Sequence, residues 1–230
     1  TVRTAAAREV SFKGTPFVNM LGKYGNFEVD SNADGLADGL SNQSTAGDIS
    51  YSFSVGEQTI TRIADSGNAG LTMNALVVSG RTYFLAAYYK ANQSLSISAS
   101  YLNWISTSGV GGGENLTTSY KRLTTKGTAT SNNNDGIILL NTLPVTVFPI
   151  GASITIKQIV FVDLTSRGAL DPIRQAKYGV ANWADLTEAQ LEAEIPYFDG
   201  YISANTELAE TSDIAVESVG KNLLGCRIVD

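Results

Sequence analysis

A two-residue alternation of large and hydroxyl-bearing side chains recurs through the first 165 residues and restricts the possible folds more than any other feature. It is clearest in the segment 49–55, where Ile49, Tyr51, Phe53 and Val55 are separated by three serines. Because successive side chains of a β-strand point to opposite faces, we expect four large side chains on one face and three hydroxyls on the other. Similar runs predict strands at 58–64, 71–79, 82–91, 94–101, 117–124, 136–141 and 153–163.

Turn-forming residues separate these runs, for example in the glycine- and asparagine-rich segments 66–68, 126–127 and 132–136. About eight or more strands with such turns between them predict an all-β fold, an antiparallel β-sandwich of the jelly-roll kind. The run 153–163, SITIKQIVFVD, alternates at first and then becomes almost wholly apolar. That change is expected of a central strand covered on both faces.

The spacing of apolar residues becomes helical after the last predicted sandwich strand. Leu186, Leu191 and Ile195 can share one stripe of a helix. The segment Thr187–Gln190 has a capping-box pattern, and Pro196 is expected to end the helix after about two turns.

These patterns divide the chain into four expected parts. Residues 1–16 form an N-terminal connector, and 17–166 form the sandwich. Residues 167–200 form a short helical linker, and 201–230 form an extended C-terminal arm or the start of a next module. The extended arm needs a partner for its backbone groups, and a neighbouring subunit or the next module could supply it.

The chain of 230 residues has no histidine and a single cysteine, Cys226. Imidazole-dependent nucleophilic mechanisms, imidazole-ligated metal sites and an internal disulfide are therefore excluded within it. The net charge of −6 argues against nucleic-acid binding, which needs an excess of Lys and Arg. There is no run of 18 apolar residues and no basic-then-apolar leader, so we expect no membrane insertion.

The densest acidic segment, DSNADGLADG at 30–39, has the pattern of a loop that wraps a hard cation. Side-chain oxygens at relative positions 1, 3, 5 and 9, with a glycine at 6 and a carbonyl at 7, suit calcium better than magnesium. The alternative is a turn that caps itself through side-chain to backbone hydrogen bonds. The predicted ligands of a structural Ca²⁺ are Asp30, Asn32, Asp34, Asp38 and the carbonyl of Leu36, with Glu28 and Asp163 as additional candidates.

Three segments resemble motifs of a known family. Gly25–Glu28 followed by DSNADGLADGL is similar to the opening of the carbohydrate-binding-module-like jelly rolls of bacteriophage tail and other virion proteins, with Leu40 where Trp is usual. The segment 178–200, YGVANWADLTEAQLEAEIPYFDG, resembles the one that follows such modules, although it departs from the pattern at Val180–Ala184. The ending SVGKNLL is similar to the start of a further module.

The resemblance implies a non-enzymatic structural or adhesive component of a virion, in a tail, baseplate or fibre. Its expected partners are other virion proteins or copies of itself, and host-surface carbohydrate where a sugar is bound. The expected location is the virion outside the cell. The alternative is a non-catalytic carbohydrate-binding module of a secreted polysaccharide- or peptidoglycan-degrading enzyme.

Sugar recognition needs aromatic faces together with amides or carboxylates that hydrogen-bond hydroxyls. Tyr101, Asn103 and Trp104, close to a glycine-rich loop, are the candidate glycan-binding residues. The tyrosines of the preceding strand are further candidates, but we expect Tyr83 and Tyr89 to pack in the core.

No residues are assigned a catalytic role. Glu188, Glu192 and Glu194 are expected to lie on a solvated helix face. A glycoside hydrolase is a weaker alternative, because its two carboxylates can be distant in sequence and meet only in three dimensions.

Overall fold

The computed structural model describes residues 17–44, 47–65, 69–97, 101–104, 114–132, 137–198 and 206–208. The predicted connector 1–16, the glycine-rich loop after Trp104 and most of the predicted C-terminal arm lie outside these residues. The strands are β1 (Phe17–Asn19), β2 (Leu40–Asn42), β3 (Ile49–Ser54), β4 (Glu57–Arg62), β5 (Ala69–Met73), β6 (Thr82–Ala91), β7 (Leu95–Ile97), β8 (Tyr101–Trp104), β9 (Glu114–Leu116), β10 (Lys121–Thr128), β11 (Ile137–Leu143), β12 (Ser153–Asp163) and β13 (Thr206–Leu208). The helices are η1 (Gly22–Asn26), α1 (Leu164–Arg167), α2 (Pro172–Tyr178), η2 (Trp183–Asp185) and α3 (Glu188–Glu194).

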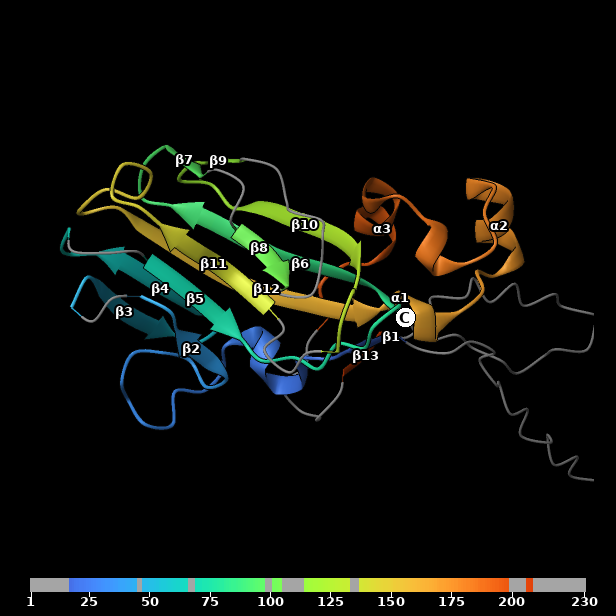
Figure 1. The fold of residues 1–230 in the computed structure, drawn as a ribbon, viewed down its shortest axis with the longest axis horizontal. Coiled ribbons are helices and arrows are strands. Elements are labelled where there is room, and N and C mark those ends of the chain that lie inside the picture. Colours follow the sequence, from blue (N-terminus) through green and yellow to red (C-terminus); the bar gives the residue numbers. More distant parts are fainter. Residues whose placement is uncertain are drawn as a thin grey trace, which may run out of the picture.

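Two antiparallel sheets face each other and form a β-sandwich (Figure 1). The five-stranded sheet has the order β10-β6-β12-β4-β3, and the four-stranded sheet has the order β2-β5-β11-β8. The chain passes repeatedly from one sheet to the other, as from β4 to β5, β5 to β6 and β11 to β12. The predicted all-β antiparallel sandwich of the jelly-roll kind is therefore confirmed.

The core between the sheets is built from the inward-facing residues of each strand. On β6 these include Tyr83 and Tyr89, which are buried as predicted, and the Tyr83 ring stacks on Phe161 with centroids 5.2 Å apart. On β3, Ile49 is buried, but the expectation for Val55 was wrong. This side chain is 71% exposed, because β3 ends at Ser54 and the chain turns there.

The central strand β12 contains a β-bulge that reverses its alternation. Lys157 pairs with Tyr88 and Val160 pairs with Ala86, so β12 has one more residue than β6 between these pairs. The extra residue is accommodated at Gln158, which has a left-handed φ of 53°. As a result, Lys157 and Val160 lie on the same face, although a regular strand would place residues three apart on opposite faces.

The side chain of Asn19 completes the hydrogen bonding of β12 beyond the bulge. Its amide donates to the carbonyl of Ile159 at 2.9 Å, and its carbonyl accepts from the backbone of Phe161 at 3.2 Å. Asn19 is fully buried, and the backbone of Met20 donates to the carbonyl of Phe161 at 2.8 Å, so these two residues take the place of a neighbouring strand there.

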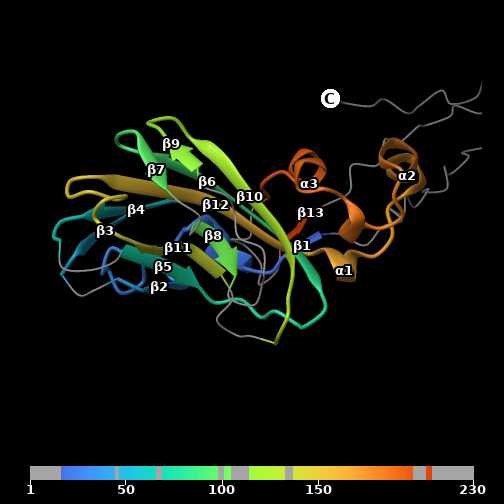
Figure 2. The same cartoon turned by 45° about the horizontal axis from the view of Figure 1, so that its top comes forward.

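The helical segment after β12 covers the outer face of the five-stranded sheet at one end (Figure 2). Trp183 and the predicted stripe of leucine and isoleucine residues pack on outward-facing β6 and β12 residues. The predicted double coverage of β12 is therefore confirmed. So is the capping box, because Thr187 and Gln190 bond reciprocally at the start of α3. The buried residues of this second core are Phe84, Ala86, Val160, Val162, Leu164, Leu170, Trp183, Leu186, Leu191, Ile195 and Phe198.

Part of the predicted C-terminal arm pairs with the beginning of the same chain. Strand β13 is antiparallel to β1, with Val18 opposite Glu207. The backbone of Thr206–Leu208 therefore needs no neighbouring subunit or next module as a pairing partner. Among the described residues, no helix is long and apolar enough to cross a bilayer.

Candidate functional site

The helical segment leaves part of the outer face of the five-stranded sheet open to solvent. Outward-facing residues of β3 and β4 make this region rich in hydroxyl groups. Thr59 on β4 and Thr155 on β12 are hydrogen-bonded to each other at 2.9 Å. The other hydroxyl residues of β3 and β4 on this face are Ser50, Ser52, Ser54 and Thr61.

Four charged and aromatic residues meet on the same face, and we call them the Tyr120 cluster: Glu57, Lys90, Tyr120 and Lys157. Tyr120 lies just before β10, and its hydroxyl donates to the Glu57 carboxylate on β4 at 2.5 Å. Since β6 and β12 lie between β10 and β4, the Tyr120 side chain reaches across the sheet. The ammonium nitrogens of Lys90 and Lys157 lie 4.4 and 3.9 Å from the centroid of its ring.

The cluster combines charges of both signs at the edge of solvent. Lys90 and Glu57 have about a third of their side-chain surface exposed, and their charged groups are 3.8 Å apart. Burial, together with the hydrogen bond to Glu57 and its negative charge, raises the pKa of Tyr120 well above its usual value. Tyr120 therefore stays a neutral hydrogen-bond donor, and the cluster has one negative and two positive groups.

Tyr88 links this cluster to the helical layer. It pairs with Lys157 on one side and with Arg122 on the other, and the Arg122 guanidinium lies 5.9 Å from its ring centroid. Arg122 donates to the backbone carbonyls of Glu192 and Ile195 at the end of α3. Because α3 holds Arg122 in this way, Tyr88 lies at the border between the covered and the open parts of the face.

The sequence patterns did not predict this cluster. A signal for part of it exists, because Tyr88 and Lys90 alternate with the buried Tyr89 and must share the outer face of β6. The other members are Tyr120, just before β10, Glu57 on β4, and Lys157 on β12, directly before the bulge. Their proximity depends on strand order and register.

The acidic loop between η1 and β2 is held by hydrogen bonds within itself. Both oxygens of Asp30 accept from loop backbone groups, from Asp34 at 3.3 Å and from Gly35 at 2.9 Å. Asp34 accepts from the backbone of Leu36 at 2.8 Å and from the Asn32 amide at 2.9 Å. Asp38 accepts from the backbone and the hydroxyl of Ser31.

The loop is also fixed to the sandwich by Gln58. This buried side chain accepts from the backbone of Ala37 at 2.7 Å and donates to the carbonyl of Gly35 at 2.9 Å. Gly35 has a φ of +84°, and a Cβ there would lie 2.8 Å from the carbonyl oxygen of Tyr51. Only glycine fits this close approach. Gln58 was not among the residues expected to hold the loop.

In the described part of the chain, no three His, Cys, Asp or Glu side chains come close enough together to hold one metal ion. The loop carboxylates are directed instead to N–H groups, the arrangement of a self-capping turn. The donor atoms are still hard oxygens of the kind that calcium binds. Calcium binding by this loop stays a prediction.

The structure does not bring Asp163 to the loop, so its assignment as an additional ligand was wrong. Asp163 caps α1 by accepting from the backbone of Ser166 at 2.9 Å, and it pairs with Arg81 at 2.6 Å. Helix α1 and the acidic loop lie at opposite ends of the sandwich (Figure 1). Glu28 is next to the loop, where it accepts a hydrogen bond from Asn26 at 2.5 Å.

Tyr101, Asn103 and Trp104 belong to β8, at the edge of the four-stranded sheet. Their backbones pair with Leu140, Ile138 and Ile137 of β11, respectively. They therefore belong to the other sheet, apart from the Tyr120 cluster. Their side chains lie outside what the structure describes, so their role in glycan binding stays a prediction.

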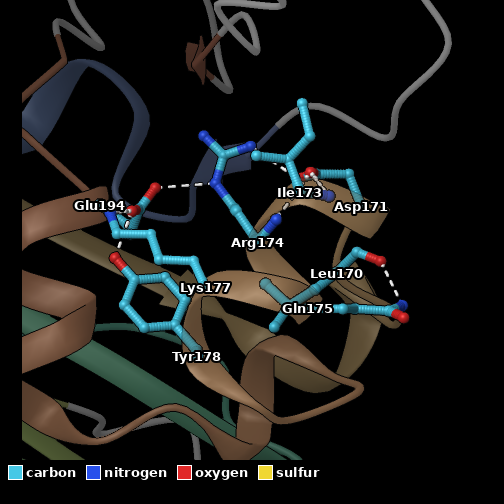
Figure 3. Close-up of polar contacts among 8 residues, drawn as sticks. All are labelled: Leu170, Asp171, Ile173, Arg174, Gln175, Lys177, Tyr178 and Glu194. Atoms are coloured by element: carbon cyan, nitrogen blue, oxygen red, sulfur yellow. Dashed lines mark hydrogen bonds and ion pairs between the residues drawn. The ribbon is translucent and has the colours of Figure 1, made fainter.

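Glu194 was expected on a solvated helix face, and the structure shows it instead in a cluster of ion pairs between α2 and α3 (Figure 3). It accepts from Arg174 and Lys177, each at 2.7 Å, and from the Tyr178 hydroxyl. Burial alone would raise the pKa of its carboxyl group, but these hydrogen bonds outweigh that effect and lower the pKa to about 2. We call Glu194, Arg174, Lys177 and Tyr178 the Glu194 clasp.

No protein-family model matches the sequence, and no curated protein matches it. Similar solved structures include the N-terminal cellulose-binding domain of Cellulomonas fimi β-1,4-glucanase C, with 17% identity and a TM-score of 0.41 over 56% of this chain and 90% of that one. A variant of a family 29 carbohydrate-binding module has 18% identity and a TM-score of 0.38 over 57% and 86%. An arabinose-bound α-L-arabinofuranosidase has 11% identity and a TM-score of 0.45 over 66% and 27%.

Proposed function

We propose that this chain is a non-enzymatic carbohydrate-binding module, and that its contact surface is the open part of the outer face around the Tyr120 cluster. The observation that supports this most is the meeting of Tyr120, Glu57 and two lysines on a sheet face lined with hydroxyl groups. Saccharide hydroxyls need both donors and acceptors in fixed positions. The ammonium groups donate, the Glu57 carboxylate accepts, and serine and threonine hydroxyls do both.

The positions of the cluster residues are set by the sheet rather than by loops. Each of the strands β4, β6 and β12 contributes one charged side chain, and β10 begins right after Tyr120. Binding groups on such elements lose little freedom when a ligand binds, which lowers the entropic cost of association.

The wider setting of this module is proposed from sequence motifs alone. The resemblance to phage tail proteins supports a virion component that contacts host-surface glycans and assembles with other virion proteins or copies of itself. A module of a secreted polysaccharide- or peptidoglycan-degrading enzyme would use the same surface. Mass spectrometry of purified virions and of culture supernatant, searched for this sequence, separates the two settings.

Binding of the chain to an array of neutral and acidic glycans tests the proposed function. We expect binding that Glu57→Ala and Tyr120→Ala each reduce at least about tenfold, because each removes a polar group that no other residue replaces. Thr72→Ala, on a strand of the opposite sheet, is the control and should leave binding unchanged. Binding that survives both cluster substitutions in folded variants would place the contact surface elsewhere.

A further inference from the structure

We propose that the Tyr120 cluster selects saccharides that bear carboxylate groups, such as uronic-acid oligosaccharides. This inference rests on the proposed function and adds the chemical class of the ligand.

The charges of the cluster are not balanced. Lys90 and Lys157 supply two positive charges, and Glu57 supplies one negative charge. The two ammonium nitrogens lie 4.4 and 3.9 Å from the centroid of one ring, so they are at most about 8.3 Å apart. Two neighbouring cations at a partly solvated surface repel, and an anion placed between them relieves that repulsion. The local excess of positive charge contrasts with the net charge of −6 for the whole chain.

The Tyr120 ring already has two cationic partners. Its centroid is 3.9 Å from one ammonium group and 4.4 Å from the other, so the two lysines already occupy space next to the ring. Stacking of a pyranose on a ring face that they contact would have to displace them. A ligand carboxylate can instead approach the two ammonium groups while the ring keeps them in place.

The bulge in β12 is a second, independent observation at the same place. Gln158, directly after Lys157, has a φ of 53°, a conformation that costs free energy for a residue with a side chain. The bulge is what allows Lys157 to face outward together with Val160, while Ile156 and Ile159 stay in the core. A regular strand with the same hydrophobic positions beyond the bulge would turn Lys157 inward. The strained backbone at Gln158 therefore keeps Lys157, the second cation of the pair, on the outer face.

Groups for the hydroxyls of such a sugar lie beside the cation pair. Thr59 on β4 is partly exposed, and its hydroxyl is 2.9 Å from that of the buried Thr155, which pairs with Lys90 across β12 and β6. The Glu57 carboxylate lies on the same face and can accept from a sugar hydroxyl. The cluster can therefore contact both the carboxylate and the hydroxyls of one uronic-acid residue.

The test compares oligogalacturonate with its methyl ester, because the two ligands differ in charge and share the same sugar backbone. Isothermal titration calorimetry should show at least about tenfold weaker binding of the methyl ester, since the ester removes the charge–charge attraction. Binding of the acid should also weaken as sodium chloride rises from about 0.05 to 0.5 M. An array of other uronic-acid and sialic-acid oligosaccharides, each with a neutral counterpart, extends the comparison beyond one sugar.

The variants Lys90→Gln and Lys157→Gln identify the residues responsible. Each should weaken binding of the acidic ligand more than binding of its neutral counterpart, and the double variant should abolish the preference. Lys121→Gln is the matched control. Lys121 is opposite Tyr89 on β6, and its ion pair is with Glu114, which is not a member of the Tyr120 cluster. Circular dichroism and melting curves confirm that each variant is folded.

The outcomes separate this inference from the proposed function. Equal binding of acidic and neutral ligands, or preference for the neutral ones, overturns the carboxylate inference and leaves carbohydrate binding in place. Binding of no glycan in the array overturns both. An acidic preference that persists in the double variant also overturns the inference, because the preference would then arise elsewhere.

Discussion

Asn19 is a buried residue whose side chain takes the place of backbone partners on β12. It serves the carbonyl of Ile159 and the N–H of Phe161, both in the interior of the sandwich. We predict that Asn19→Ala lowers the free energy of unfolding by about 2–4 kcal/mol, because the carbonyl of Ile159 and the N–H groups of Leu21 and Phe161 lose this partner. Denaturant unfolding measures this, with the exposed Asn74→Ala as the control. A loss of stability equal to that of the control would contradict the assigned role.

The acidic loop is the other place where single residues decide the outcome. If Asp30, Asp34 and Asp38 hold calcium as predicted, calcium raises the melting temperature by mass action and a chelator lowers it. Asp34→Ala should remove the calcium dependence. Differential scanning calorimetry with calcium or with chelator measures the effect.

The self-capping turn gives the opposite result. Melting would not respond to calcium or chelator, and Asp30→Ala would still destabilise the loop, because Gly35 loses its hydrogen-bond acceptor. Calorimetric titration that detects no bound calcium would confirm that the loop is held by its own N–H groups and by Gln58.

At the scale of elements, the bulge in β12 determines which residues face the helical layer. We predict that Gln158→Val lowers the free energy of unfolding by about 1–2 kcal/mol, because β-branched residues tolerate a positive φ poorly. Gln158→Gly should not lower it, since glycine adopts this conformation without strain. Thr61→Val, on the outer face of the neighbouring strand β4, is the control. Equal stability of the valine and glycine variants at 158 would contradict the strain.

The Glu194 clasp makes the junction of α2 and α3 sensitive to acid. The folded carboxyl group has a pKa of about 2, and its ordinary value is 4.5. The folded state therefore keeps this charge at a pH where the unfolded chain takes up a proton. The stabilisation is complete above about pH 5 and is lost as the pH falls toward 2.

Comparison with Glu194→Gln tests the clasp. The variant should melt at a lower temperature than the natural chain at pH 7, and the difference should shrink progressively between pH 5 and pH 2.5. Glu192→Gln, an exposed position on the same helix, should show little difference at either pH. A difference between the Glu194 variant and the natural chain that does not change with pH would contradict the ionic role of Glu194.

At the scale of the whole molecule, the segment 167–198 is a layer of the structure as well as a connection. Trp183 and Leu191 are buried against Phe84 and Val160, which belong to the central strands of the sandwich. Two parts that share a core are expected to unfold together.

Trp183→Ala tests this coupling. We expect a loss of about 3–5 kcal/mol of stability, because a large buried ring is removed. We also expect the sandwich and the helical layer to melt in one transition that moves as a whole. Far-ultraviolet and near-ultraviolet circular dichroism follow the two parts. Separate transitions, with only the helical signal affected, would show that the layer is an independent unit.

Most of the secondary structure could be predicted from the sequence because its signals are local. The alternation at 49–54 and 82–91, the apolar run of β12 and the capping box of α3 each lie within a dozen residues, and each is found in the structure. The start of α2 was missed, although Asp171 before Pro172 is a regular helix-starting pair. Periodicity alone overestimated β3, because it does not show where a strand ends.

The sequence by itself determined the fold class, the strands that form the core and the helix that follows them, since side-chain alternation and capping act between neighbouring residues. Only the tertiary structure decided which polar groups meet. The bulge at Gln158 shifts the phase of β12, and strand order brings Glu57, Lys90, Tyr120 and Lys157 together from four parts of the chain. The tertiary structure also places Asp163 away from the acidic loop. Contacts between distant residues depend on register and strand order, and these are set by the packing of the whole core.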